Sequence, residues 1–211
     1  MKTYLFDFDG TLVDSMPVFG GLMLKILNEH GIKYGDDVLK TITPLGYVGT
    51  AKYFISMGLN KTEEELVALM KEYAVYEYTN TVPAKNNVEK VLKELKSRGD
   101  SLNILTASPH DLLDPCLKRL GLYELFDNVW SCVDFQTTKS DPEIYRRAAE
   151  KIGVPVNEMI FLDDNYNADK TAKEAGAIVY GVFDQTSAEY SQEIRAVTDK
   201  YVTNFIELLD E

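Results

Sequence analysis

The residues best suited to chemistry lie near the start of the chain, in the run Asp7-Phe8-Asp9-Gly10-Thr11. Its two carboxylates stand two residues apart, directly after an apolar segment of the kind that forms a buried strand. Asp7 can attack an electrophile or hold a hard cation, and Asp9 can give and take a proton. Gly10 lets the backbone approach a ligand closely. Two solvated acids before a turn would show the same pattern. Whether these acids form a functional site therefore depends on groups elsewhere in the chain that could act with them.

Groups that complement these carboxylates follow three later apolar segments: Thr106-Ala107-Ser108, Lys139 and Asp163-Asp164. The first combines a hydroxyl with the open backbone N–H groups of a predicted helix start, which bind anions readily. Each group alone has an ordinary interpretation: Thr106 can end a strand, Lys139 can be a solvated lysine, and the acids can cap a helix. Together they suit an enzyme that transfers phosphoryl groups. The transition state of that reaction spreads negative charge over three oxygens, which cations, hydroxyls and backbone N–H groups can hold.

The elements that must position these groups follow from the apolar pattern. Five runs are predicted to be strands: 3–8, 101–106, 128–133, 159–162 and 177–182. Helical patterns alternate with the later strands, and two of these helices are predicted to begin at Ser108-Pro109 and Asp141-Pro142. Residues 187–210 are predicted to be mostly helical with a short edge strand near 201–202. This alternation is typical of an α/β fold, a Rossmann-like parallel sheet with helices on both faces, in which ligands bind at the carboxyl ends of the strands.

Residues 16–80 have helical spacing and no strand pattern. An all-helical insert after the first strand of an α/β chain indicates a separate cap. We therefore expect a core domain of residues 1–15 and 81–211 and a helical cap domain of residues 16–80. Within the cap, Tyr47 and Lys52 are candidates for substrate contact, although both also suit an ordinary helix surface.

The longest helix of this insert is predicted to begin with the capping box Thr62-Glu63-Glu64-Glu65 and to run through Tyr78. Its apolar stripe is predicted to face the core of the insert and consists of Leu66, Leu69, Met70, Tyr73 and Tyr76. The tyrosine and methionine content of this stripe favours packing over a cofactor site.

The composition limits the classes of partner. The chain has 211 residues, 45% of them hydrophobic, which suits one large domain or a domain with an insert. Lys and Arg total 22 against 34 Asp and Glu, and the net charge of -12 argues against nucleic acid or an anionic membrane as partner.

The spacing of Cys116 and Cys132 suits neither a metal motif nor a disulfide framework, so buried free thiols are expected. Without a signal-peptide pattern or a long apolar run, we expect a cytoplasmic protein.

The order and spacing of these motifs resemble those of the haloacid dehalogenase superfamily. The resemblance is carried by the first motif, extended through Leu12-Val13-Asp14-Ser15, and by Thr106, Lys139 and Asp163-Asp164. It covers nearly the whole chain. The position of the helical insert is similar to that in the phosphoglycolate phosphatase and β-phosphoglucomutase branch. The resemblance implies a phosphatase with a haloacid dehalogenase-like core and an inserted helical cap.

The resemblance also implies a role for each matching residue. Asp7 would be the nucleophile, and Asp9 would be the general acid and base, with its backbone carbonyl on Mg²⁺. Gly10, Thr106 and the Ala107 N–H would bind phosphoryl oxygens. Lys139 would neutralise these oxygens and the nucleophile.

Asp164, together with Asp163, would complete a metal site that includes Asp7 and Asp9 and keeps several waters on Mg²⁺. Three positions depart from the common family pattern: Asp163 stands where Gly is often found, Ser140 follows Lys139 where Pro is frequent, and the third is Ala168. Ala168 occupies the place where a later acid is common, and whether Asp169 replaces that acid stays open.

The sequence therefore predicts an enzyme, a phosphoric monoester hydrolase that uses Mg²⁺ and an aspartyl-phosphate to hydrolyse a small phosphorylated metabolite. One alternative is a sugar phosphomutase of the β-phosphoglucomutase type. Another is a receiver-like signalling domain, against which Asp9 and the long insert argue. A protein that only binds phosphoryl groups is a further alternative, against which the presence of every expected catalytic residue type argues. Neither the substrate nor the oligomeric state can be inferred from the sequence.

Overall fold

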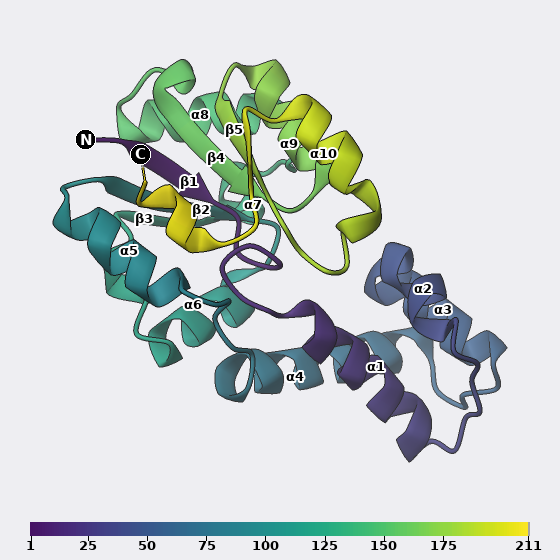
Figure 1. Ribbon diagram of the computed structural model, residues 1–211. Helices are drawn as coiled ribbons and strands as arrows, with labels where there is room; N and C mark the ends of the chain where they lie inside the picture. Colours follow the sequence, from purple (N-terminus) through teal and green to yellow (C-terminus); the bar gives the residue numbers. More distant parts are fainter. Residues whose placement is uncertain (211) are drawn as a thin grey trace. The chain divides into compact units, whose positions relative to one another are not determined.

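The computed structural model describes residues 1–210 and divides the chain into two compact units. One unit comprises residues 1–14 and 82–211, and the other comprises residues 15–81. The larger unit holds the sheet and the smaller unit is helical (Figure 1). Each unit is described by itself.

The larger unit contains a six-stranded sheet in which every neighbouring pair is parallel. The strand order is β3-β2-β1-β4-β5-β6, which is the order of the Rossmann fold. The strands are β1 (Thr3–Phe6), β2 (Ser101–Thr106), β3 (Asn128–Ser131), β4 (Met159–Asp163), β5 (Ile178–Val182) and β6 (Lys200–Val202). The sequence-based prediction of an α/β parallel sheet is confirmed.

Helices connect the strands of this unit. The α-helices are α5 (Val88–Ser97), α6 (His110–Arg119), α7 (Cys132–Phe135), α8 (Glu143–Ile152), α9 (Tyr166–Ala175) and α10 (Ser191–Val197). Single 3₁₀ turns are η2 (Tyr123–Leu125), η3 (Val156–Glu158), η4 (Ala188–Tyr190) and η5 (Phe205–Leu208). Because the crossovers cover both faces, β1 is buried along its whole length.

The two faces of β1 pack against different layers, since successive side chains of a strand point to opposite sides. Leu5 belongs to a buried cluster that includes Tyr145 of α8. Tyr4 and Phe6 face the other way, and the ring of Phe6 stacks on Phe205 with centroids 6.2 Å apart. The sheet is thus a fixed platform for the residues that follow its strands.

The third strand is shorter than the sequence suggested. We predicted a strand over 128–133, but β3 ends at Ser131 and the short helix α7 begins at Cys132. A local capping box explains the difference: Ser131 N–H donates to Asp134 at 2.8 Å, and the Ser131 hydroxyl accepts from Val133 N–H at 3.4 Å.

Two helices begin later than predicted. The structure starts α6 at His110 and α8 at Glu143, so that Pro109 and Pro142 stand at the N-cap position. Ser108 does not cap α6, because its hydroxyl donates to Asp9 instead. Asp141 still accepts from the Glu143 N–H at 3.0 Å.

The smaller unit contains α1 (Met16–Glu29), α2 (Val38–Ile42), α3 (Gly46–Ser56) and α4 (Glu63–Asn80), with the 3₁₀ turn η1 (Thr43–Leu45). The predicted capping box of α4 is present between Thr62 and Glu65. The predicted stripe is partly wrong: Tyr76 is 59% exposed, and the buried residues of α4 are Leu66, Met70, Ala74 and Tyr78. The buried face follows a four-residue step, which brings Ala74 inward and leaves Tyr76 outside.

The two connections to the smaller unit run side by side within the larger unit. Val13 and Ala84 form an antiparallel bridge. The Asp14 N–H donates to the Pro83 carbonyl at 2.9 Å, and the Lys85 N–H donates to the Leu12 carbonyl at 2.9 Å. The chain therefore leaves and re-enters the larger unit at one paired junction.

Two further sequence-based expectations concern single features. Cys116 and Cys132 are buried free thiols, as predicted. Among residues 1–210, no helix is long and apolar enough to cross a bilayer.

Candidate active site

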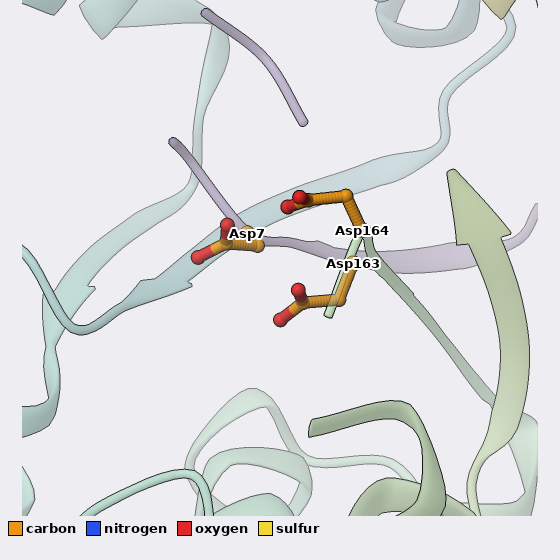
Figure 2. Close-up of side chains that lie close together, drawn as sticks. All are labelled: Asp7, Asp163 and Asp164. Carbon is orange, nitrogen blue, oxygen red and sulfur yellow. The ribbon is translucent and has the colours of Figure 1, made fainter. Parts of the chain in front are cut away.

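Three carboxylates meet where β1 and β4 end. Asp7 follows β1, Asp163 ends β4, and Asp164 follows it (Figure 2). One oxygen from each lies within 4.8 Å of the others. The strands are neighbours in the sheet, and the Asp7 N–H donates to the Leu162 carbonyl at 2.8 Å. Parallel strand pairing therefore places acids that are far apart in the sequence in one cluster.

Lys139 is the positive partner of this cluster. Its ammonium group forms ion pairs with Asp7 and with Asp163 Oδ2, the latter at 2.8 Å. The backbone of the lysine is fixed by Tyr145, whose hydroxyl donates to the Lys139 carbonyl at 3.0 Å. Burial acts to lower the pKa of Lys139, but the charges of Asp163 and Asp7 outweigh it and hold this pKa well above its usual value. Lys139 is therefore a permanent cation here.

The Asp7 carboxyl titrates near neutral pH. Its pKa is raised from 3.8 to about 7, chiefly by burial and also by the charges of Asp163 and Asp9. Lys139 acts in the opposite direction. Without that lysine, Asp7 would take up a proton even more readily. Lys139 therefore favours the ionised form of Asp7.

The end of β2 brings a hydroxyl pair to the same edge of the sheet. Thr106 is buried, and its Oγ1 accepts a hydrogen bond from the Ser108 N–H at 3.0 Å. The Ser108 hydroxyl in turn donates to Asp9 Oδ2 at 2.5 Å. Ala107 between them is exposed. Asp9 is thus oriented by the loop that carries the predicted phosphate-binding groups.

The carboxylates differ in how many hydrogen bonds and ion pairs their oxygens accept. Asp163 accepts from the Asn165 N–H at 2.8 Å and from Lys139, so both of its oxygens are engaged. Among residues 1–210, no side-chain hydrogen bond or ion pair reaches Asp164. Burial, followed by the charges of Asp163 and Asp7, raises the pKa of Asp164 well above its usual value. Three carboxylates against one lysine leave the cluster short of positive charge, which fits a hard cation such as Mg²⁺.

Asp169 lies outside this cluster of three. It is fully buried in the first turn of α9, and neither of its oxygens has a hydrogen-bond partner among the described residues. Burial, then the charges of Asp163 and Asp164, raises its pKa to about 10. The structure therefore groups Asp164 and Asp163, and not Asp169, with Asp7.

The sequence analysis missed a histidine next to the Thr106–Ser108 loop. His110 Nδ1 contacts Asp114 at 2.8 Å and Nε2 contacts Asp134 at 2.9 Å, which ties α6 to α7. Because carboxylates only accept hydrogen bonds, both contacts together require a protonated ring. The hydrogen bond to Asp114 is the main reason that the pKa of His110 is raised. The four-residue spacing of His110 and Asp114 could have predicted the first contact.

A second network was also missed. Lys85 pairs with Asp184 at 2.8 Å and donates to the carbonyl of Gly10, directly after Asp9. Lys85 lies on the connection that returns from the helical unit, Asp184 lies in the loop after β5, and Gly10 lies in the first turn of the chain. No sequence spacing predicts a contact between them.

The cap candidates lie within the helical unit. Tyr47 packs on Phe19 with ring centroids 6.0 Å apart. The Lys52 side chain is 66% exposed and pairs loosely with Glu63 at 3.7 Å. Lys52 thus has the features of an ordinary surface residue, whereas Tyr47 is half-buried.

Residues 1–176 match the haloacid dehalogenase-like hydrolase family, and the chain belongs to this family. The pyrophosphatase PpaX of Bacillus velezensis is 30% identical over 179 residues, which cover 84% of this chain and 81% of PpaX. Validoxylamine A 7'-phosphate phosphatase of Streptomyces hygroscopicus is 28% identical over 191 residues, covering 89% and 88% of the two chains. The predicted family is confirmed, and these names agree with the predicted phosphatase class.

Solved structures share the fold over the full length. A Thermotoga maritima protein assigned as a β-phosphoglucomutase superposes with a TM-score of 0.87 at 22% identity, covering 100% of this chain and 99% of that one. This likeness shows the fold and agrees with the predicted α/β core with a helical insert.

Proposed function

We propose that this hydrolase is a Mg²⁺-dependent phosphatase that acts on a small phosphorylated metabolite through an aspartyl-phosphate. The observation that carries the proposal is the contact of Lys139 with Asp7 inside a cluster of buried and half-buried acids. The contact favours the ionised, nucleophilic form of Asp7, next to acids that outnumber their one lysine partner. The phosphatase names of the relatives support the same reaction class.

The reaction has two displacements. An Asp7 oxygen forms a bond to phosphorus while the bond from phosphorus to the leaving oxygen breaks, and Asp9 gives its proton to that oxygen. Asp9 then takes a proton from water, whose oxygen attacks phosphorus and releases the Asp7 carboxylate and inorganic phosphate. General acid–base help of this kind contributes about 10²–10⁴-fold. Ser108 keeps the Asp9 carboxyl on the side of the Thr106–Ser108 loop.

The remaining groups hold the phosphoryl oxygens and balance charge. In this proposal the Gly10 backbone, the Thr106 hydroxyl and the Ala107 N–H bind these oxygens, and Lys139 neutralises them. Asp7, Asp164 and the Asp9 carbonyl would hold Mg²⁺, with Asp163 orienting Lys139. When bound, the ion supplies positive charge to the transferring phosphoryl group.

The test is a screen of phosphorylated metabolites with the purified protein. We expect release of inorganic phosphate from at least one small phosphomonoester in the presence of Mg²⁺, and loss of turnover after dialysis against EDTA with recovery on adding Mg²⁺. Full activity after EDTA would contradict the metal requirement. A parallel incubation with β-glucose 1-phosphate and a trace of the 1,6-bisphosphate tests the mutase alternative. Glucose 6-phosphate forming faster than inorganic phosphate would overturn the hydrolase assignment.

We further propose that the helical unit of residues 15–81 selects the substrate and contributes little to the chemistry. Tyr47→Ala is expected to change the ratio of kcat/KM between two metabolite substrates by about tenfold, the usual range for one pocket contact. Activity toward a generic aryl phosphate should change much less. Lys52→Ala is the matched surface control. Equal losses on every substrate would indicate that this unit carries a catalytic group.

A further inference from the structure

Lys85 is a second buried cation beside the acid cluster, and the mechanism above does not use it. Its side chain is 17% exposed. The ammonium group pairs with Asp184 Oδ2 at 2.8 Å and donates to the carbonyls of Phe183, at 2.9 Å, and of Gly10. An ammonium group has three donors, so these three acceptors satisfy it. Lys85 is therefore held in one place.

The Gly10 carbonyl belongs to the turn that directly follows Asp9 and lies against the acid cluster. Gly10 has a φ of +74°, and a Cβ built on it would lie 2.7 Å from Asp164 Oδ1. The Asp164 carboxylate thus lies directly against the Gly10 backbone. By holding the Gly10 carbonyl, Lys85 holds this turn in contact with Asp164.

Asp184 fixes the other end of the pair. It is 4% exposed, follows β5, and accepts from the Thr186 N–H at 2.8 Å and hydroxyl at 2.5 Å. The charges of Asp184 and Lys85 both act on Asp164, and they act in opposite directions. The pair therefore acts electrostatically on Asp164, the one carboxylate of the cluster that no side-chain hydrogen bond or ion pair reaches among residues 1–210.

We propose that the Lys85–Asp184 pair is a positioning and charge-balancing element of the cation site, where Lys85 holds the Gly10 turn against Asp164 and limits the affinity of the cluster for Mg²⁺. The inference rests on the proposed function, since it assumes that this cluster binds the ion. It assigns no contact between Lys85 and substrate. Lys85 acts through the Gly10 carbonyl and through its charge.

The two members of the pair make opposite predictions. Removing the lysine charge leaves the cluster more negative, so Lys85→Met is expected to tighten Mg²⁺ binding by about three- to tenfold. Removing the carboxylate charge leaves Lys85 unbalanced, so Asp184→Asn is expected to weaken Mg²⁺ binding by a similar factor. The double variant should lie near the wild type. A purely structural role would move both single variants in the same direction.

Calorimetric titration of the metal-free protein with MgCl₂, without substrate, measures these affinities directly. Lys90→Met and Asp111→Asn, both on exposed helix positions, are the matched charge controls and should leave the affinity unchanged. Lys85→Gln removes the charge but keeps a donor for the Gly10 carbonyl. It should tighten binding as Lys85→Met does, while losing less kcat toward an aryl phosphate.

The outcomes separate the inference from the function on which it rests. If the wild type binds no Mg²⁺, both are overturned. If the wild type binds Mg²⁺ but the single variants shift together, or do not shift, the inference alone fails. The main-chain bond from Lys85 to the Leu12 carbonyl is retained in every variant, which favours folding of the set. Should Lys85→Met not fold, Lys85→Gln against Asp184→Asn gives the same test of sign.

Discussion

Asp7→Asn is expected to reduce phosphatase turnover by about 10⁴-fold or more, the scale seen when a nucleophile is removed. The amide keeps the shape of the side chain but cannot form the acyl-phosphate. Steady-state kinetics and a search for phosphorylated protein in single turnovers check this result. Asp111→Asn on the exposed start of α6 is the control and should keep full activity. If the Asp7→Asn variant kept the wild-type kcat, Asp7 could not be the nucleophile.

The same substitution is expected to stabilise the fold at alkaline pH. Folding raises the pKa of Asp7 from 3.8 to about 7, so the folded state favours the protonated carboxyl, and its stability declines as pH rises between these values. Asn cannot ionise, and Lys139 keeps Asp163 as a partner. We expect the free energy of unfolding without metal to rise by about 1–3 kcal/mol at pH 8, and by much less at pH 5. Urea denaturation at both pH values measures this difference.

Lys139→Met is the second large prediction. Activity should fall by about 10²–10⁴-fold, because a charge aimed at the phosphoryl oxygens is lost. Lys139 also lowers the pKa of Asp7, so its removal moves that pKa above about 7. The residual activity should therefore reach its limit at a higher pH than that of the wild type. A pH–rate profile of kcat/KM from pH 5 to pH 9 measures the displacement.

Stability provides an independent measure of the same change. Losing Lys139 leaves Asp7 and Asp163 buried without their shared cation, which costs about 3–5 kcal/mol when both are ionised. The loss should be smaller at pH 5, where Asp7 is protonated. Lys139→Arg, which keeps the charge, should retain part of the stability, and Lys90→Met should behave like the wild type. An unshifted pH profile in Lys139→Met would show that Asp7 does not depend on this lysine.

Much of the architecture could be predicted from local pattern. The apolar runs gave the strand positions, and parallel pairing then required that the residues after β1, β2 and β4 lie at one edge of the sheet. Asp7, Thr106 and Asp164 come to that edge for this reason. Lys139 arrives from a loop, and its place among the acids was inferred from the set of groups that phosphoryl transfer requires and from the resemblance.

Other parts of the site depend on contacts that no local pattern encodes. Ser108 is a residue type that commonly caps helices, yet its hydroxyl donates to Asp9 instead. Asp9 follows another strand and lies within hydrogen-bond distance only in the folded chain. Charged atoms of Lys85 and Asp184 lie 2.8 Å apart, but most of the sequence of the larger unit separates the two residues along the chain. Propensity and periodicity report on neighbours along the chain, so pairings of this kind require the folded coordinates.

The paired junction at Val13 and Ala84 has a consequence for how this protein could diversify. Because the chain leaves and returns through adjacent backbone-paired residues, the sheet needs only a short closed loop at this point. A gene segment of any length whose ends lie close together could therefore replace residues 15–81 without altering strand order or register. Under the proposed role of this unit, exchanging the segment between related genes would be a direct route to new substrate preferences, with the sheet inherited intact.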